Sequence, residues 1–176
     1  RISFVLCGCS FFGAAQAEPG LIATYSDGKN SARRIVSTPN FALSADESVH
    51  SQVAPQFEAT YEGVLQVVRG GDYRFSGDAG IELGGQNAKG KALKLTTGEH
   101  AIKITYVRQP GPTRLQVRWQ ADFFADEPIP ASAYAHAKKQ EDDLTKRWTS
   151  IEQGRLLYEN LSCGACHGAD EWGLTT

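Results

Sequence analysis

"AIKITYVRQPGPTRLQVRW", residues 101–119, is the stretch that decides the fold of this chain. Apolar residues alternate with polar ones on both sides of its Pro-Gly-Pro segment: Ile102, Ile104 and Tyr106 before it, and Leu115, Val117 and Trp119 after it. A period of two gives each of two strands one apolar and one polar face. We therefore expect a hairpin across the turn, with the apolar side chains, from Tyr106 to Trp119, in a core formed with another sheet.

Further short strands surround this pair. Val64–Val68 and Asp72–Ser76 flank the turn Arg69-Gly70-Gly71, which predicts a second hairpin because glycines allow a positive φ. Three more strand-like runs occur, at residues 21–25, 57–61 and 81–83. The fold class is therefore mainly β, and residues 18–132 are expected to form one antiparallel β-barrel or sandwich.

The N-terminal residues have the pattern of an export signal. Arg1 precedes an apolar run at residues 2–12, and small residues stand at Ala15 and Ala17. We expect residues 1–17 to be a signal peptide and the mature chain to begin at Glu18. The expected location is periplasmic or extracellular, and no membrane span is expected once the signal is removed.

Two alternatives to a cleaved signal stay open: a transmembrane anchor, and a lipoprotein acylated at Cys9. Once the signal is removed, only Cys163 and Cys166 remain of the four cysteines, which does not suggest a disulfide scaffold. The formal net charge is −2, and no basic stripe interleaved with aromatic residues occurs, so nucleic-acid binding is not expected.

The pattern changes after the strand-rich region. Residues 133–149 are rich in alanine and charged residues without alternation, which predicts a helical or loosely ordered linker. Ser150 can cap a helix that begins at Ile151, with Gln153 in the capping-box position. The apolar residues of this helix lie mostly on one stripe: Ile151, Leu157, Tyr158 and Leu161.

Cys163, Cys166 and His167 form the spacing C-x-x-C-H directly after that helix. This is the attachment pattern of a covalently bound haem, in which the thiols form thioethers and the adjacent imidazole binds the iron. A thioredoxin-like redox pair, a zinc site and an incidental loop sequence are the alternatives. The first would follow a strand, and the second needs two further ligands at metal spacing.

The segment "EQGRLLYENLSCGACHGAD", residues 152–170, resembles the start of a class I c-type cytochrome domain, with Gly154 and Tyr158 matching the first helix. The resemblance implies haem c, attached to Cys163 and Cys166 and with His167 as axial iron ligand. It also implies a later helix and a later methionine ligand. The chain contains no methionine, so residues 150–176 are expected to be a truncated cytochrome c domain. The sixth ligand stays open, with His50, His100 and His136 as the histidines elsewhere in the chain.

A second resemblance covers more of the chain. "GLIATYSDG", "FEATYEGVLQVVRGGDYRFSGDAGIELGGQ" and "TTGEHAIKITYVRQPGPTRLQVRWQ" are similar to the protective-antigen-type domain, a β-barrel that often binds carbohydrate. In sugar-binding members, two adjacent aspartates help to hold a calcium ion. Here Asp78 is followed by Ala79, so the second carboxylate is missing. Glycan binding through aromatic residues and docking of a protein partner stay open.

These patterns together predict an exported electron-transfer protein in which the β domain binds a carbohydrate or a partner. The expected partners are a redox protein and a glycan. We assign no catalytic residue, although a catalytic domain in further chain stays open. The alternative is a secreted glycan-binding β domain whose C-x-x-C-H is incidental or binds a metal.

Overall fold

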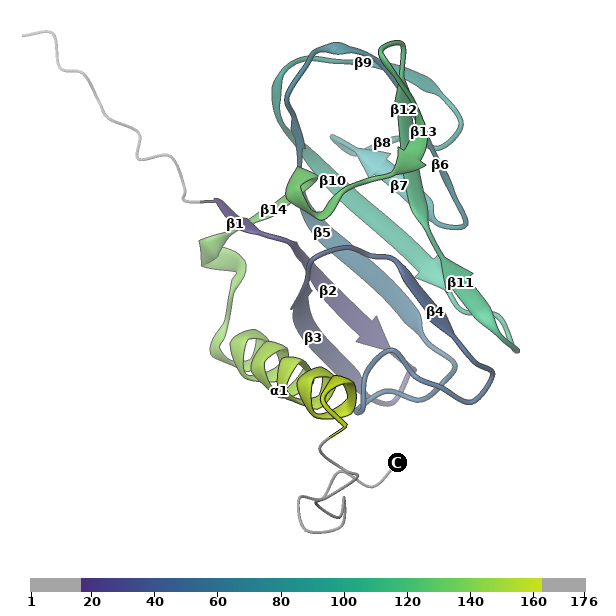
Figure 1. Ribbon diagram of the computed structural model, residues 1–176, viewed down its shortest axis with the longest axis vertical. Coiled ribbons are helices and arrows are strands. Elements are labelled where there is room, and N and C mark those ends of the chain that lie inside the picture. Colours follow the sequence, from purple (N-terminus) through teal and green to yellow (C-terminus); the bar gives the residue numbers. More distant parts are fainter. Residues whose placement is uncertain (1–16, 163–176) are drawn as a thin grey trace, which may run out of the picture.

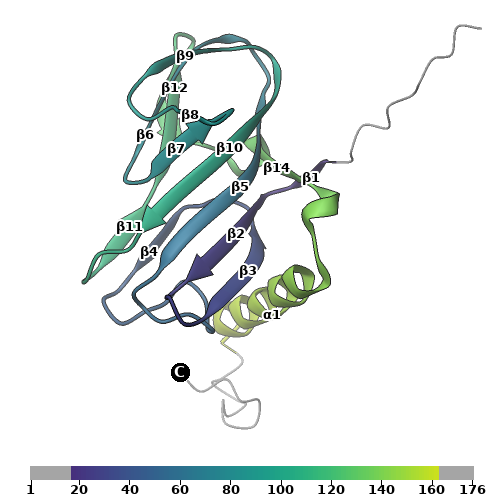
Figure 2. The same ribbon diagram turned by 180° about the vertical axis from the view of Figure 1, so that it is seen from behind.

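The computed structural model describes residues 17–162, which form a β-sandwich with one α-helix against its edge (Figures 1 and 2). The larger sheet is antiparallel and has the order β1-β14-β5-β10-β7-β8, and β2 and β3 extend it along the other half of β5. Its strands are β1 (Ala17–Pro19), β2 (Leu21–Ser26), β3 (Ser31–Val36), β5 (Glu58–Val67), β7 (Gly80–Leu83), β8 (Gln86–Asn87), β10 (Gly98–Val107) and β14 (Tyr134–Ala137).

The second layer consists of a four-stranded sheet and a two-stranded one. The four-stranded sheet has the order β13-β12-β6-β9, from β6 (Gly71–Gly77), β9 (Ala92–Leu95), β12 (Val117–Ala121) and β13 (Phe124–Pro128). β4 (Phe41–Leu43) pairs with β11 (Thr113–Leu115). One apolar cluster, from Leu21 through Tyr61 and Ile104 to Val117, joins the layers. None of the described sheets closes on itself, so the expected alternative of a barrel is replaced by a sandwich.

Both predicted hairpins are wrong in their pairing, although their strands exist. β10 pairs with β5 and β7, whereas β11 pairs with β4 and β12 pairs with β6 and β13. β5 and β6 likewise belong to different sheets. The physical reason is that each strand of a predicted pair has one apolar face. The chain buries both faces by placing the two strands in different layers, on opposite sides of the core. The glycine and proline turns thus connect the two layers.

The predicted core residues are confirmed. Tyr106 and Trp119 are 7% exposed, Leu115 is 1% exposed and Val117 is fully buried. The Tyr106 hydroxyl also forms a hydrogen bond with the Thr113 hydroxyl across the turn. The alternation in residues 101–119 therefore correctly assigned which side chains face inward.

The region after the sandwich is more ordered than its composition suggests. A 3-10 turn, η1 (Ala131–Ala133), leads into β14, which lies between β1 and β5. A second turn, η2 (Lys138–Gln140), precedes helix α1 (Asp143–Asn160). The helix expected after Ser150 is thus present but begins at Asp143, where Asp142 accepts a hydrogen bond from the Thr145 N–H at 2.6 Å. The segment 133–149, expected as a linker, consists largely of these elements.

Candidate functional site

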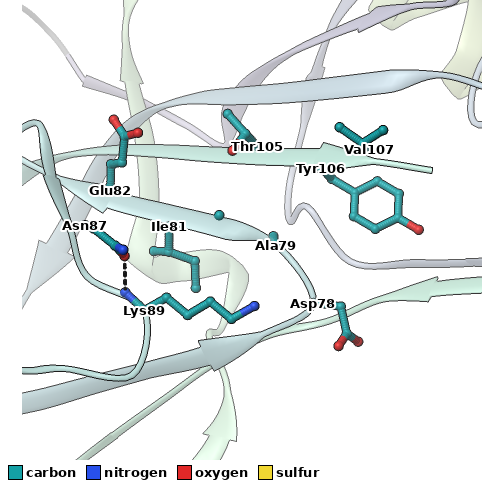
Figure 3. A pocket seen from close by; sticks show the side chains of 10 residues that line it. Asp78, Ala79, Ile81, Glu82, Asn87, Lys89, Thr105, Tyr106 and Val107 are labelled. Atoms are coloured by element: carbon teal, nitrogen blue, oxygen red, sulfur yellow. Dashed lines mark hydrogen bonds between the residues drawn. The ribbon is translucent and has the colours of Figure 1, made fainter. Parts of the chain in front are cut away.

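The first candidate site is an open groove at the rim of the sandwich, called here the Asp78 groove. It has a volume of about 540 Å³ and lies where the turn Asp78-Ala79 passes from β6 to β7 beside β10 (Figure 3). The side chains that give it polar character are those of Asp78, Glu82, Asn87, Lys89 and Thr105. The groove therefore presents carboxylate, amide, ammonium and hydroxyl groups to solvent.

Strand pairing places this groove. β7 pairs with β10 as far as the partners Gly80 and Thr105, and β10 continues past that point through Tyr106 and Val107. This part of β10 and the Asp78 turn border the groove together. Gly80 allows the close approach of the strands, because a Cβ there would lie 2.6 Å from the Thr105 hydroxyl oxygen.

Lys89 and Asn87 lie on the same side of the groove. The backbone N–H of Lys89 donates a hydrogen bond to the Asn87 side-chain oxygen at 3.0 Å. Figure 3 shows the Lys89 side chain extending in the direction of Asp78. Ile81 points into the core and is 1% exposed, so it forms an apolar floor beneath these polar groups.

The calcium chemistry implied by the resemblance lacks its second carboxylate. Ala79 is 3% exposed and belongs to the core cluster, so its side chain is turned inward from the groove. Within residues 17–162, no three His, Cys, Asp or Glu residues are grouped as metal ligands would be.

The second candidate site is the contact between α1 and β3. β3 is an edge strand, and α1 lies along it (Figures 1 and 2). The Thr149 hydroxyl accepts a hydrogen bond from the Ile35 N–H at 2.9 Å and donates one to the Thr145 carbonyl at 2.7 Å. Arg33 and Asp142 form an ion pair at 3.1 Å at the start of the helix. The helix thus satisfies and covers backbone groups that a free edge would expose.

A buried polar group lies at the centre of this contact. Glu152 is 1% exposed and accepts hydrogen bonds from the Ser51 hydroxyl at 3.1 Å and from Arg155 Nε at 3.0 Å. Arg34 Nη1 lies 3.5 Å from the same carboxylate, and His50 Nε2 lies 3.9 Å away. We call these five residues the Glu152 cluster.

The charges in the cluster determine the protonation states of Glu152 and His50. Burial alone would raise the pKa of Glu152, but the hydrogen bond and charge of Arg155, with the charge of Arg34, outweigh burial and lower it. Burial lowers the pKa of His50, and the two arginines lower it further against the attraction of Glu152. Glu152 is therefore a carboxylate, and His50 is a neutral imidazole near neutral pH.

The residues predicted to attach haem, Cys163, Cys166 and His167, lie outside the described residues, as do residues 1–16 of the predicted signal. Of the other histidines, His136 is buried, with Nδ1 3.1 Å from the Gly20 carbonyl and Nε2 3.0 Å from Glu141. His100 Nε2 lies 2.7 Å from the Thr96 carbonyl. Both histidines thus have polar partners within the described residues.

Some apolar residues of α1 and of the turn that follows it are exposed among polar ones. Of the stripe predicted from the sequence, Ile151, Leu157 and Leu161 are 41%, 60% and 72% exposed, whereas Tyr158 is half-buried. Gly154 lies in the same helix with open space around it, because a Cβ there would meet nothing within 4 Å. The sequence did not indicate that the face of α1 with Thr145, Thr149 and Glu152 packs against the sandwich. These residues recur at helical spacing but are polar. A search for apolar stripes overlooks such a face.

Within residues 17–162, no helix has the length and apolar character needed to cross a membrane. The sequence matches no family model, and no curated protein matches it either. Similarity is found among solved structures, and it concerns the fold.

An anti-sigma factor domain-containing protein from Clostridium clariflavum superposes with a TM-score of 0.58 at 15% identity, covering 69% of this chain and 48% of that one. A second anti-sigma factor domain-containing protein gives 0.60 at 16% identity, covering 72% and 51%. The present chain thus spans about half the length of these two proteins. The PA14 domain of the antifreeze protein MpAFP gives 0.53 at 13% identity, covering 69% of this chain and 92% of the domain. The described residues therefore have a PA14-like sandwich fold, which is the protective-antigen-type fold that the sequence resembles.

Proposed function

We propose that this chain is part of an exported protein in which a carbohydrate-binding β-sandwich is joined to a covalently attached haem that transfers electrons. The position of α1 carries the proposal. The helix is fixed to the sandwich by the buried Glu152 cluster, and the C-x-x-C-H sequence starts at Cys163, shortly after the helix ends at Asn160. The sandwich would then serve to bring the redox group to a surface that it binds.

The Asp78 groove supports the binding part of this proposal. Sugar hydroxyls both donate and accept hydrogen bonds, and the groove offers an acceptor at Asp78, donors at Lys89 and both kinds at Asn87. Its open shape suits one or a few residues of a longer polysaccharide better than an enclosed small molecule. Because position 79 is an alanine, binding should not need calcium.

Affinity electrophoresis in gels that contain soluble mannan, xylan or β-glucan tests the binding part. We expect at least one of these polysaccharides to retard the protein. Asp78→Ala and Lys89→Ala should abolish the retardation, and EDTA should leave it unchanged. Asp122→Ala, which removes an exposed carboxylate outside the groove, is the matched control and should be retarded like the unaltered protein. Absence of retardation by all three polysaccharides, or equal retardation of Asp78→Ala, contradicts carbohydrate binding at this groove.

Two observations favour the haem part. α1 is present immediately before the C-x-x-C-H sequence, as the resemblance to class I cytochromes requires. Ile151 and Leu157 of α1 and Leu161 just after it are also exposed, as would suit a cytochrome helix that packs against a later helix. Cys163 and Cys166 would hold the haem by thioethers, His167 would bind its iron, and the bound haem would supply one-electron chemistry.

Haem staining after denaturing electrophoresis tests the haem part, because only thioether-linked haem survives denaturation. The natural protein, exported in a host with haem-attachment machinery, should give a stained band. The double variant Cys163→Ala/Cys166→Ala should give none, and His100→Ala should stain like the unaltered protein. An unstained band from fully exported natural protein contradicts haem attachment and favours a glycan-binding domain alone.

A further inference from the structure

The buried imidazole of His50 lies between α1 and the sandwich. Its side chain is fully buried, and Nδ1 accepts a hydrogen bond from the Gln52 N–H at 3.1 Å. Within residues 17–162, Nε2 has no hydrogen-bond partner, and it lies 3.9 Å from Glu152 Oε1. The ring also packs edge-on against Trp148 of α1, with the centroids 5.1 Å apart. A titratable group thus forms part of the contact that fixes the helix.

The surroundings accept only the neutral form of this ring. Because Nδ1 accepts the Gln52 N–H, the single proton of the neutral ring is on Nε2 and points toward Glu152. A second proton would have to go on Nδ1, where it would meet the Gln52 N–H and break that hydrogen bond. The charged groups that face the ring are Arg34 from β3 and Glu152 and Arg155 from α1, and the ring of Tyr25 lies 6.2 Å away on β2. Two cations and one carboxylate therefore surround any added charge.

We propose that His50 is an acid-sensitive latch, whose protonation releases α1 from β3 while the sandwich stays folded. The helix meets the sandwich mainly along β3, through the Glu152 cluster, Thr149 and the ion pair of Arg33 with Asp142. The apolar core lies between the two layers, and no residue of α1 belongs to it. Protonation of His50 should therefore undock the helix before the sandwich unfolds.

The direction of the pH dependence follows from the pKa of His50, which lies below its ordinary value of about 6.5 in the docked state. In the released state His50 meets water, and its pKa returns toward that value. The released state then binds more protons than the docked state below about pH 6.5. Docking is fully stable above that pH and weakens as the pH falls toward the lowered pKa. Release would uncover the Ile35 N–H on the edge of β3, which Thr149 covers in the docked state.

Nuclear magnetic resonance of the whole chain from about pH 7.5 to about pH 5 tests the latch. We expect the indole N–H resonance of Trp148 and the amide of Ile35 to shift or broaden on acidification, while the amides of Tyr61 and Ile104 in the core keep their positions. His50→Gln should remove this change, because a glutamine oxygen accepts the Gln52 N–H and cannot be charged. His100→Gln, which alters a histidine of β10 separated from β3 by β2 and β5, is the matched control and should behave like the unaltered chain.

Two results would overturn the proposal. One is an unaltered chain whose Trp148 and Ile35 resonances keep their positions down to about pH 5. The other is a His50→Gln chain that undergoes the same change at the same pH. If His50→Gln does not fold, the imidazole resonances of His50 in the unaltered chain decide the matter. Their titration must coincide with the change at Trp148, and a His50 that titrates while Trp148 remains docked excludes the latch.

Discussion

At the scale of single residues, Arg108 shows how a buried charge organises a loop. Its side chain is 3% exposed, and its guanidinium donates hydrogen bonds to the carbonyls of Ser44, Ala45 and Glu47. The guanidinium also lies 5.7 Å from the centre of the Phe57 ring. Carbonyl oxygens and an aromatic face thus take the place of a paired carboxylate, and they fix the connection between β4 and β5.

Replacing this arginine should be costly even with another cation. Lysine has three donors at one point and cannot reach carbonyls spread over the planar guanidinium, so Arg108→Lys leaves buried acceptors unsatisfied. We expect the free energy of unfolding to fall by about 1–3 kcal/mol in urea titrations. The exposed Arg114→Lys is the control and should change it by less than about 0.5 kcal/mol. Equal stabilities of the two variants would show that the carbonyl contacts contribute little.

The carboxylate of Asp27 makes the stability of a turn depend on pH. This carboxylate accepts hydrogen bonds from the backbone N–H groups of Lys29 at 2.8 Å, Asn30 at 2.6 Å and Ala54 at 2.9 Å, and these bonds lower its pKa. A lowered pKa means that the folded state holds this proton less tightly than the unfolded state. The stabilisation is therefore present above the ordinary pKa of an aspartate, about 3.9, and is lost as the pH falls below it.

Asp27→Asn should lower the melting temperature near neutral pH and flatten the loss of stability on acidification, because the amide cannot be neutralised. Thermal unfolding followed by circular dichroism at several pH values measures both effects. Asp46→Asn, at an exposed position in the connection between β4 and β5, should retain the pH profile of the unaltered chain. Parallel pH profiles for Asp27→Asn and the unaltered chain would assign the acid sensitivity to other groups.

At the scale of elements, two glycines have opposite roles. Gly63 lies in β5 between its pairings with β2 and β14, and a Cβ there would be 2.4 Å from the Ala135 carbonyl oxygen and 2.8 Å from a methyl group of Leu21. Gly154 lies in α1 with open space around it. The first permits a close approach of backbones, whereas the second only weakens a helix.

The same substitution should therefore change stability in opposite directions. We expect Gly63→Ala to lower the free energy of unfolding by about 1–3 kcal/mol, because the added methyl group must displace backbone atoms. Gly154→Ala should strengthen α1 by about 0.5–1 kcal/mol through helix propensity. Urea unfolding and the helical signal in circular dichroism measure the two effects. Destabilisation by both alanines would mean that Gly154 makes a contact that its open surroundings do not suggest.

The elements also show how far the sequence could lead. Alternation in residues 101–119 assigned the inward side chains correctly, because the period of a strand determines its faces. The alternation could not assign which strands pair with each other. Two strands bury their apolar faces equally well as neighbours in one sheet or as members of two sheets that face each other across the core. β14 was overlooked because all but the last of its residues are buried, which removes the alternation. The Glu152 cluster was overlooked because its members are far apart in the sequence and the docking face of α1 is polar.

At the scale of the whole molecule, the sandwich and the helix that leads to the C-x-x-C-H sequence form one structure. The contacts of α1 with β3 are made by residues separated by more than a hundred positions, such as Ile35 with Thr149 and Ser51 with Glu152. A loosely ordered linker would have let the two predicted functions act independently. Docking instead fixes the helix that precedes the proposed haem segment against β3, at the opposite end of the strand order from β7 and β8, whose residues border the Asp78 groove.

The last prediction concerns the haem attachment proposed for residues 163–167. In the natural protein, produced with haem-attachment machinery, Cys163→Ala or Cys166→Ala should remove one thioether and shift the absorption bands of the reduced haem, because one vinyl group stays conjugated with the ring. His167→Ala should leave the iron without its axial histidine and largely abolish stable haem-bound protein. Absorption spectra of the reduced proteins and haem staining measure these effects. His136→Gln is the control for a ligand from the sandwich, because His136 already lies near the Gly20 carbonyl and Glu141. Suppose that His167→Ala keeps the normal reduced-haem spectrum and His136→Gln loses it. The axial iron ligand would then be His136 in the sandwich and not His167 in the cytochrome-like segment.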